Sequence, residues 1–324
     1  MDSGHPKEVA IVTGSNTGIG RETALSLAKD GMKVFMACRS ADRGHEAASY
    51  IREACPEADV EVLLLDLKTL DSVRKCATDF KSRNLPLKLL VNNAGVTLGT
   101  PWYTDEGVGG SAQVNYLGHY VLTRLLEDSL VAGAPSRVVN VSSIMGRGVT
   151  IPDPEKFFKD FRAGQYAQAK LANILFSFEL QRRWQVKGIQ TCAVDPGAVM
   201  SDIWRRSRFN KPPISWGMKV AFAPTWDGAT PVYHAATTPL KTEQDKTPLR
   251  LFARGGFAWW GVTKPSPTPI LQLTAAALDW PVRFLSRGMF FSKVEEVPAN
   301  PQAYDEKLAS KLWSLSADIA GLPE

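Results

Sequence analysis

A tyrosine and a lysine stand four positions apart in this 324-residue chain, as Tyr166 and Lys170. The segment Tyr166–Val186 is typical of a helix, and residues at i and i+4 share a helix face, so we expect the ammonium of Lys170 near the phenol of Tyr166. A free phenol has a pKa of about 10, and a nearby cation favours the phenolate. The pair therefore predicts proton transfer to or from a carbinol oxygen. Taken alone, the spacing also fits two ordinary side chains on a helix surface.

Two serines, Ser142 and Ser143, follow the β-rich run Arg137–Val141. A hydroxyl at the end of a strand can hydrogen-bond a substrate oxygen, or it can simply cap the turn that follows. The serine pair is therefore a second candidate for the same chemistry.

A glycine-rich segment follows the first β-rich run and reads Thr13-Gly14-Ser15-Asn16-Thr17-Gly18-Ile19-Gly20. Glycines let the backbone turn tightly and approach a pyrophosphate, while the N-terminus of the next helix supplies amide donors. The spacing is GxxxGxG rather than the GxGxxG of the general dinucleotide fingerprint, and it also fits an ordinary strand-to-helix turn. Its position directly after the first strand favours a dinucleotide site.

Arg39 follows the second β-rich run, at the place where an acidic residue would hold the ribose hydroxyls of NAD. A guanidinium suits a 2′-phosphate instead, so Arg39 predicts NADP(H), with a solvated loop arginine as the alternative. Asp66 and Leu67, after the third run, are expected at the adenine end. After the fourth run, small residues and amides beside the cofactor are expected from Asn93, Ala94 and Gly95.

The elements that must position these residues are short runs rich in Val, Ile and Leu, alternating with longer helix-like segments. The runs are Val9–Thr13, Lys33–Cys38, Val60–Leu65, Leu87–Val91, Arg137–Val141 and Ile189–Val194, and the helical segments include Ile19–Asp30, Ala41–Ala54 and Leu70–Arg83. This alternation predicts an α/β fold, a Rossmann-type doubly wound parallel sheet flanked by helices. Ligands of such sheets bind beyond the carboxyl ends of the strands, where the motifs above lie.

The composition changes beyond residue 203. Ten of the 21 prolines and six of the nine tryptophans lie between residues 204 and 281. We expect no regular βαβ rhythm there until Met289–Phe291, which resembles a last strand. A final helix is predicted over Pro301–Ile319, with one apolar face formed by Leu308, Leu312 and Leu315. We therefore predict one domain over 1–324, with a core of about 7–202 and 288–320 and an insertion over about 203–287.

Composition excludes several classes of protein. Hydrophobic residues make up 44% and charged residues 22%, so disordered and collagen-like chains are excluded. The net charge is only +5, and the sequence lacks the concentrated basic stripe expected of a nucleic-acid binder. With no apolar stretch long enough to span a membrane and no room for a signal peptide before Val9, we expect a cytoplasmic protein. The cysteines lack CxxC spacing, so we expect reduced thiols and no metal site.

The motifs TGxxxGxG, NNAG, a strand ending in Ser-Ser, YxxxK and Asp195-Pro196-Gly197 occur in this order. In this set the chain, over about residues 7–202, resembles the short-chain dehydrogenase/reductase family. The resemblance implies that Tyr166 is the catalytic acid/base and that Lys170 lowers its pKa and holds the nicotinamide ribose. It implies that Ser143, which begins Ser-x-x-Gly, hydrogen-bonds the substrate oxygen, and that Asn115 links Lys170 to water in a proton relay.

The same resemblance implies contacts between the nicotinamide amide and the segment that follows the last run. The cofactor-binding residues expected in all are Gly14, Ser15, Asn16, Thr17, Gly18, Ile19, Gly20, Arg39, Asp66, Leu67, Asn93, Ala94, Gly95, Tyr166, Lys170, Pro196, Gly197, Val199 and Ser201. Hydride would pass between the nicotinamide and the substrate carbon.

A narrower likeness lies in Asn16–Gly20, Ala37–Arg39, Lys170–Phe176, Phe290–Ser292 and the 23-residue separation of Ser143 from Tyr166. These features resemble the retinol-dehydrogenase-like branch, which implies a retinoid, a sterol or a lipophilic aldehyde or ketone as substrate, with NADP(H). We therefore predict an oxidoreductase acting on CH–OH donors. The alternative is a catalytically silent regulatory or scaffold protein that keeps the cofactor site.

The late segment leaves three interpretations open. The resemblance places the substrate loop after Ser201, so residues 203–287 are expected to cover the active site, and their aromatic side chains favour an apolar substrate. The segment could instead be an appendage that packs its own tryptophans. Alternatively, aromatic and basic residues mixed over 250–287 predict peripheral contact with an intracellular membrane. The resemblance also suggests a homodimer through the helices that carry Asn115 and Tyr166.

Overall fold

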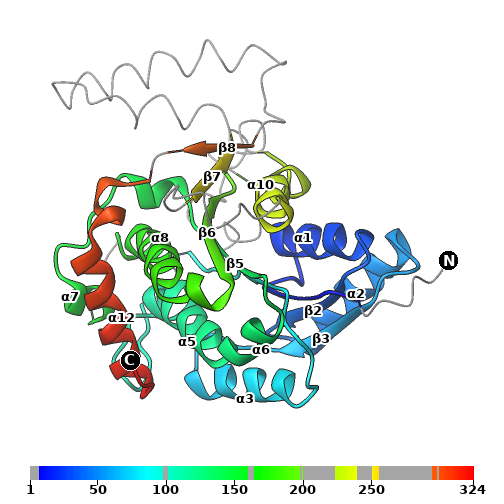
Figure 1. Ribbon diagram of the computed structural model, residues 1–324, viewed down its shortest axis with the longest axis horizontal. Coiled ribbons are helices and arrows are strands. Elements are labelled where there is room, and N and C mark those ends of the chain that lie inside the picture. Colours follow the sequence, from blue (N-terminus) through cyan, green and yellow to red (C-terminus); the bar gives the residue numbers. More distant parts are fainter. Residues whose placement is uncertain are drawn as a thin grey trace, which may run out of the picture.

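The computed structural model describes residues 7–97, 101–159, 164–197, 199, 223–238, 250–254, 294–297 and 299–324. Its frame is one sheet with strands β1 (Val9–Thr13), β2 (Lys33–Cys38), β3 (Val60–Leu64), β4 (Leu89–Asn92), β5 (Ser136–Val141), β6 (Ile189–Asp195), β7 (Arg250–Arg254) and β8 (Val294–Val297). The strands stand in the order β3-β2-β1-β4-β5-β6-β7-β8 (Figure 1). All neighbours pair in parallel except β7 and β8, which are antiparallel.

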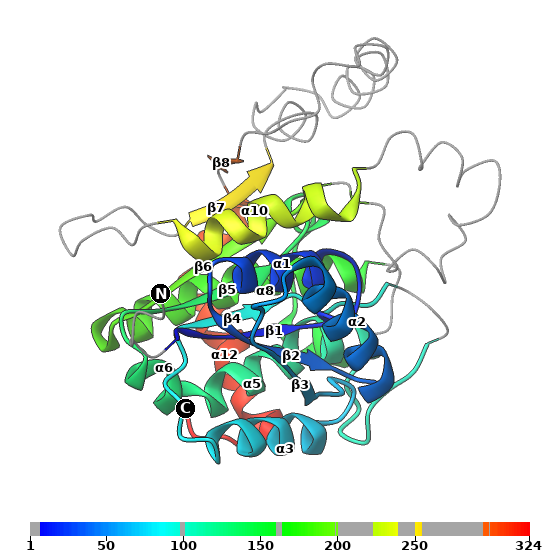
Figure 2. The ribbon, with the colours of Figure 1, turned by 90° about the vertical axis from the view of Figure 1, so that its right-hand side faces the viewer.

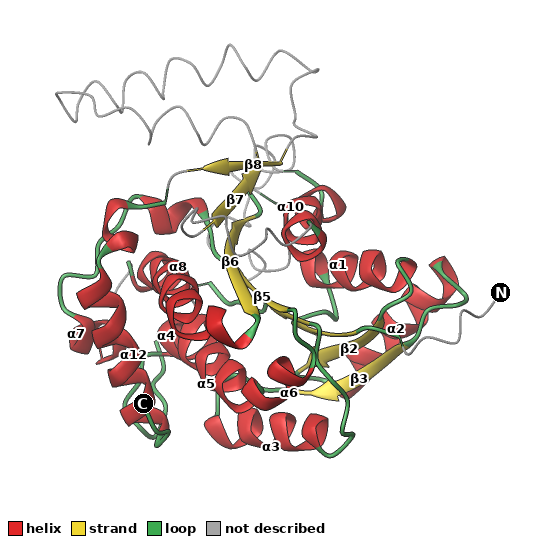
Figure 3. Cartoon of the chain, viewed as in Figure 1, coloured by secondary structure: helices red, strands yellow, loops and turns green. Residues whose placement is uncertain are grey.

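Helices cover both faces of this sheet (Figure 3). They are α1 (Gly18–Lys29), α2 (Ala41–Ala54), α3 (Leu70–Lys81), α4 (Gly110–Ala112), α5 (Gly118–Leu125), α6 (Glu127–Ala132), α7 (Pro154–Lys159), α8 (Gln165–Trp184), α10 (Thr225–Thr237) and α12 (Glu306–Ala320). Helices α1, α2 and α10 lie on one face of the sheet, and α3, α5 and α12 lie on the other (Figure 2). Apolar residues of α1, α2 and α10 belong to one buried cluster, and those of α3, α5, α8 and α12 belong to another. The predicted Rossmann-type doubly wound α/β fold is confirmed.

The central strands are buried because helices lie on both faces, and all residues of β1 and β4 are buried, whereas β3 is partly exposed. The predicted runs agree with β1–β6 to within two residues at each end. Successive strands run from β1 to β3 in one direction and from β4 to β7 in the other, so β1 and β4 flank the point where the order reverses. Ligands of such sheets bind at this point, beyond the carboxyl ends of the strands.

The expectation of no βαβ rhythm beyond residue 203 is wrong. Helix α10 covers the sheet there, and β7 extends it in parallel beside β6. The sequence concealed both elements because α10 contains Pro231 and β7 is a five-residue run with an arginine at each end. The predicted strand Met289–Phe291 lies outside the described residues, and the last strand observed is β8, whose two central glutamates hide it from an apolar pattern.

The final helix differs from its prediction at its start. Asn300 caps a 3-10 turn, η6 (Pro301–Tyr304), and its Oδ1 accepts from the amide of Gln302 at 2.8 Å. Asp305 then caps α12. The Oδ1 atom of Asp305 accepts from the amide of Leu308 at 3.0 Å. Two caps therefore divide the segment that the pattern predicted as one helix.

Much of the predicted insertion, including most of 250–287, lies outside the described residues, as does Ser201. Within the described ranges, no helix combines the length and the apolar character needed to cross a membrane. All four cysteines are free thiols, and Cys38, Cys76 and Cys192 are buried.

Candidate active site

The glycine-rich loop leaves the end of β1 and packs tightly against the loop after β4. Gly14 has a φ of +67° and Gly18 one of +59°, values that favour glycine. A Cβ on Gly14 would lie 2.9 Å from the Cα of Ala94, and one on Gly20 would lie 2.4 Å from Nδ2 of Asn93. The expected glycine and NNAG motifs are therefore brought together, with room only for glycine between them.

Thr13 connects these two loops to α5. Its Oγ1 accepts from the amides of Asn93 and Ala94, each at 2.9 Å, and lies 2.9 Å from Nε2 of His119. Because the hydroxyl has one proton and accepts twice, it donates to His119. Burial lowers the pKa of His119 to about 3, so the imidazole is neutral and its Nε2 can accept this bond.

The residues expected at the adenosine end follow β2 and β3. Arg39 is exposed directly after β2, and Ser40 caps α2 by accepting from the amide of Arg43 at 3.4 Å. Arg43 places a second guanidinium in the first turn of α2, close enough that its charge acts on the Cys38 thiol. Sequence reasoning overlooked Arg43, although its spacing from Arg39 was a usable signal.

Asp66 and Leu67 are fixed by local bonds. Oδ1 of Asp66 accepts from the amide of Lys68 at 3.0 Å. The side chain of Leu67 is buried in the core, and its carbonyl accepts from Nε2 of Gln113 at 2.9 Å. A ligand could therefore contact the backbone of Leu67 but not its side chain.

Asn115 lies in a π-helical turn, η1 (Gln113–Leu117), that leads into α5. Its Oδ1 accepts from the amide of Val96 at 2.8 Å, and its Nδ2 donates to the carbonyl of Val96 and to Oγ of Ser111, both at 3.0 Å. The side-chain amide is thus engaged in holding the loop that follows the NNAG motif. Such π-turns occur frequently at functional sites.

Ser143, Tyr166 and Lys170 come together beyond the end of β5. Ser143 caps a 3-10 turn, η2 (Ile144–Arg147), and its hydroxyl lies close enough to the phenol of Tyr166 to lower its pKa. Helix α8 starts at Gln165, so Tyr166 lies in its first turn, and Nζ of Lys170 lies 5.7 Å from the centroid of the tyrosine ring. Nζ also donates to the carbonyl of Val141 at 2.9 Å. The predicted i, i+4 proximity is observed.

The electrostatics of the pair differ from the expectation. Burial raises the pKa of Tyr166 to about 12, the hydroxyl of Ser143 opposes this, and the charge of Asp195 adds to it. The shift is opposite to the one expected from Lys170, whose ammonium is directed to a backbone carbonyl and whose own pKa burial lowers to about 8. At neutral pH the phenol therefore keeps its proton, and Lys170 is still mostly charged.

The segment after β6 carries the residues expected at the nicotinamide. Gly197 has a φ of +78°, and its amide donates to Oδ1 of Asp195 at 2.9 Å. Pro196 is buried, and Val199 forms an isolated bridge with Ala223. Ser201 lies outside the described residues, so its contact stays a prediction.

Three side chains beside these residues make contacts that the sequence did not indicate, although Asp195 belongs to the Asp195-Pro196-Gly197 motif. Arg147 and Asp195 form a buried ion pair with 3.3 Å between Nη2 and Oδ2. Asn300, just before η6, donates through Nδ2 to the carbonyls of Gly146, Arg147 and Val149 at 3.1, 3.1 and 2.7 Å. Only tertiary contact reveals them, because their partners are distant in the sequence.

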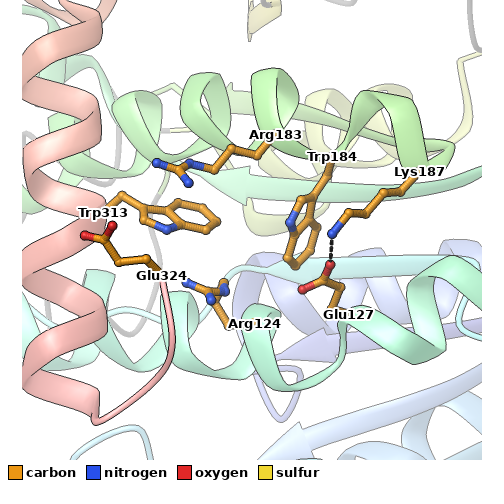
Figure 4. Close-up of a pocket in the computed structure, with 7 residues that line it drawn as sticks. All are labelled: Arg124, Glu127, Arg183, Trp184, Lys187, Trp313 and Glu324. Atoms are coloured by element: carbon orange, nitrogen blue, oxygen red, sulfur yellow. Dashed lines mark hydrogen bonds and ion pairs between the residues drawn. The ribbon is translucent and has the colours of Figure 1, made fainter.

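A cavity of about 270 Å³ lies elsewhere, at the far end of α8 (Figure 4). Trp313 stands between Arg124 and Arg183, whose guanidinium carbons lie 4.6 and 4.5 Å from the ring centroid. Trp184, which also lines it, follows Tyr166 by five helical turns, roughly 27 Å along α8. The residues lining this cavity include none of the four expected catalytic residues.

Comparisons with known proteins agree with the geometry at the sheet edge. The family described as short chain dehydrogenase matches residues 8–211. Retinol dehydrogenase 11 of Mus musculus is 36% identical over 322 residues, with 98% of this chain and 88% of that protein covered. Retinol dehydrogenase 12 of Homo sapiens is 33% identical over 320 residues, with coverages of 98% and 87%.

A solved structure has the same fold over almost the whole chain. It is an uncharacterized protein from Mycobacterium Paratuberculosis, with a TM-score of 0.68, 25% identity, and 99% of this chain and 97% of that chain covered. Together with the fold, the glycine loop and the cluster around Tyr166, these matches show that the chain belongs to the short-chain dehydrogenase/reductase family of oxidoreductases, in its retinol-dehydrogenase-like branch.

Proposed function

We propose that the chain is an NADP(H)-dependent oxidoreductase that interconverts an apolar alcohol and its carbonyl compound, with Tyr166 as the acid/base. The observation that carries this proposal is the cluster of Ser143, Tyr166 and Lys170 at the sheet edge where the glycine loop also lies. A bound nicotinamide would supply or take up the hydride.

The glycine loop fits a dinucleotide. The side chain of Thr17 does not cap α1, a 12-residue helix whose N-terminal amides point beyond the end of β1 and can serve a ligand. The close packing of Gly14 and Gly20 on the loop after β4 keeps this surface free of side chains. Backbone amides and the helix dipole together favour a pyrophosphate.

Arg39 supports NADP(H) over NAD(H). Arg39 is exposed directly after β2, at the position where a carboxylate would take the ribose hydroxyls of NAD. Arg43, one helical turn further, adds a second positive charge. Two guanidinium groups on one loop and turn are suited to a 2′-phosphate.

The protonation state of Tyr166 favours carbonyl reduction at neutral pH. With a pKa of about 12 the phenol is protonated, and it can give this proton to a carbonyl oxygen as hydride arrives at the carbon. The hydroxyl of Ser143 lies beside the phenol and can orient the same substrate oxygen. Lys170, whose ammonium donates to the carbonyl of Val141, would be the next group along the path by which Tyr166 regains a proton.

The proposed substrate class is inferred from the names of the related proteins. Proteins named retinol dehydrogenase match nearly the whole chain, so we propose a retinoid, a sterol or a lipophilic aldehyde or ketone. We also propose peripheral membrane contact through 250–287, a homodimer, and a single domain over 1–324 with an insertion over about 203–287.

The test is NADPH consumption with a panel of retinal, sterol ketones and aliphatic aldehydes. We expect turnover by the wild type and a loss of roughly 10²–10⁴-fold in kcat/KM for Tyr166→Phe. Tyr233→Phe is the matched control, because that exposed phenol on α10 bonds Asp30 at 2.8 Å, away from the site. NADPH binding without turnover of any compound, equal in wild type and Tyr166→Phe, would favour the silent regulatory or scaffold alternative.

A further inference from the structure

A buried ion pair joins the two loops that flank Tyr166. Arg147 closes the 3-10 turn η2 that Ser143 begins, and Asp195 is the last residue of β6. Their side chains are each 2% exposed, with 3.3 Å between Nη2 and Oδ2. The pair therefore ties the serine loop to the segment that leads into Gly197.

The carboxylate of Asp195 also holds the backbone of both loops. Its Oδ1 accepts from the amide of Gly197 at 2.9 Å, and the amide of Ile144 lies close enough to the same carboxylate to lower its pKa. Ile144 directly follows Ser143, so the position of the serine depends on this group. Burial raises the pKa of this carboxyl, and the guanidinium of Arg147 and the two amides oppose that rise by favouring the charged form.

Arg147 depends on Asp195 in turn. Among the described residues, its Nε and Nη2 have no hydrogen-bond partner, so the carboxylate is the group seen to compensate its charge. Asn300 binds the carbonyl of Arg147 rather than its guanidinium. A buried cation with one compensating anion makes the two charges interdependent.

These charges reach the proposed proton donor. In the described part of the chain, Tyr166 faces Ser143 of the η2 turn, Lys170 of its own helix and Asp195 of β6, while His119 of α5 faces Lys170. The negative charge of Asp195 raises the pKa of both Tyr166 and Lys170.

We propose that Arg147 and Asp195 are positioning residues, whose ion pair fixes Ser143 against the Gly197 segment and sets the electric charge that Tyr166 and Lys170 experience. This inference rests on the proposed reductase function. It adds two residues to the machinery that touch neither the substrate carbonyl nor the phenol directly and act through Ser143, Tyr166 and Lys170.

The test is a double-mutant cycle, in which kcat/KM is measured as a function of pH for the wild type, Asp195→Asn, Arg147→Met and the double variant. Asp195→Asn keeps the size of the side chain but removes the anion and leaves Arg147 uncompensated. The limb of the pH profile that reports the ionisation of Tyr166 should therefore move to lower pH, by about one unit. The double variant also lacks the anion that acts on Tyr166, so its limb should lie at lower pH than that of the wild type, as in Asp195→Asn, but without an uncompensated buried cation. Arg147→Met should leave the limb in place or move it to higher pH.

Asn300→Ala separates charge from loop position, because it loosens the same loop without changing any charge. It should lower kcat/KM with no displacement of the limb. A limb that stays in place in Asp195→Asn, a limb displaced equally by Asn300→Ala, or a double variant whose limb lies at the wild-type position would each overturn the proposal. If Asp195→Asn does not fold, a limb moved to lower pH by Arg147→Met overturns it.

A second readout does not need turnover. The ultraviolet titration of the wild type minus that of Tyr166→Phe isolates the ionisation of this phenol, and the same difference in the Asp195→Asn background should begin at lower pH. If the wild type turns over no substrate, the proposed function fails while this titration still tests the ion pair. If the wild type is active and the titration does not move, the ion-pair inference alone fails.

Discussion

The hydroxyl of Thr13 and the imidazole of His119 lie 2.9 Å apart, joining the end of β1 to α5. His119 is buried, and its pKa is lowered to about 3 because burial disfavours the imidazolium. The folded state therefore takes up this proton at much lower pH than the unfolded chain, whose histidines titrate near about 6.5.

The Thr13–His119 contact predicts a pH dependence of stability. Between about pH 6.5 and 3 the unfolded chain binds one more proton at His119 than the folded chain, so this residue's contribution to stability is full above that window and falls as pH drops through it. The slope is about 1.4 kcal/mol per pH unit. We expect urea unfolding of His119→Gln between pH 7 and 5 to lack this slope, and an unchanged slope would contradict the assignment.

Exchanging Arg39 for aspartate should reverse the cofactor preference. Arg39→Asp removes a guanidinium and introduces the carboxylate that suits ribose hydroxyls, so Kd for NADPH should rise roughly 10–100-fold while that for NADH falls or holds. Arg43→Ala should weaken NADPH less, since it removes only the second charge. The control is Lys75→Asp, the same charge change at an exposed site on α3, and fluorescence titration gives both constants.

Adding a methyl group at Gly20 should disable the glycine loop. Its Cβ would lie 2.4 Å from Nδ2 of Asn93 and 2.6 Å from the carbonyl oxygen of Gly14, so the loop after β4 must move. We expect Gly20→Ala to weaken NADPH binding by at least about tenfold, measured by calorimetry. Gly148→Ala is the matched control, because a Cβ there meets no atom within 4 Å; if both variants bind NADPH equally well, the close packing is not what shapes the site.

Removing the amide of Asn300 should destabilise the serine loop. Its Nδ2 serves three carbonyls in a buried position, and leaving them without a donor should lower the free energy of unfolding by roughly 1–3 kcal/mol in Asn300→Ala. Gln168→Ala, which removes an exposed bond to the carbonyl of Thr150 on the same segment, should cost about 0.5 kcal/mol or less. Equal costs in the two variants, measured by denaturant unfolding, would show that burial is not the deciding factor.

How much the sequence predicted depends on how local each signal was. The glycine loop, Arg39 and the Tyr166–Lys170 spacing are patterns within one turn or one helix, so they were recognisable before any tertiary contact was known. Strands β1 to β6 are runs rich in apolar residues, so they could also be recognised from the sequence. By contrast, α10 contains Pro231, and β8 carries Glu295 and Glu296 at its centre, so neither shows the expected pattern.

The missed site features depend on the folded arrangement. Arg147 and Asp195 meet because β5 and β6 pair in parallel and deliver their following loops to one edge of the sheet. The pKa of Tyr166 was predicted in the wrong direction because spacing alone indicated a nearby cation and said nothing about burial or about Asp195.

Helix α12 has a consequence for how the protein can assemble. It lies along α5 and α8, where the hydroxyl of Tyr116 bonds Ser316 at 3.0 Å and that of Tyr120 bonds the carbonyl of Trp313 at 3.2 Å. Helix α12 of the same chain thus covers the face of α5 and α8 that a second subunit could otherwise cover. A copy approaching from this side would meet α12 first. A chain cut before Glu306 would expose an aromatic face around Tyr116 and Tyr120, and we expect it to self-associate in sedimentation experiments.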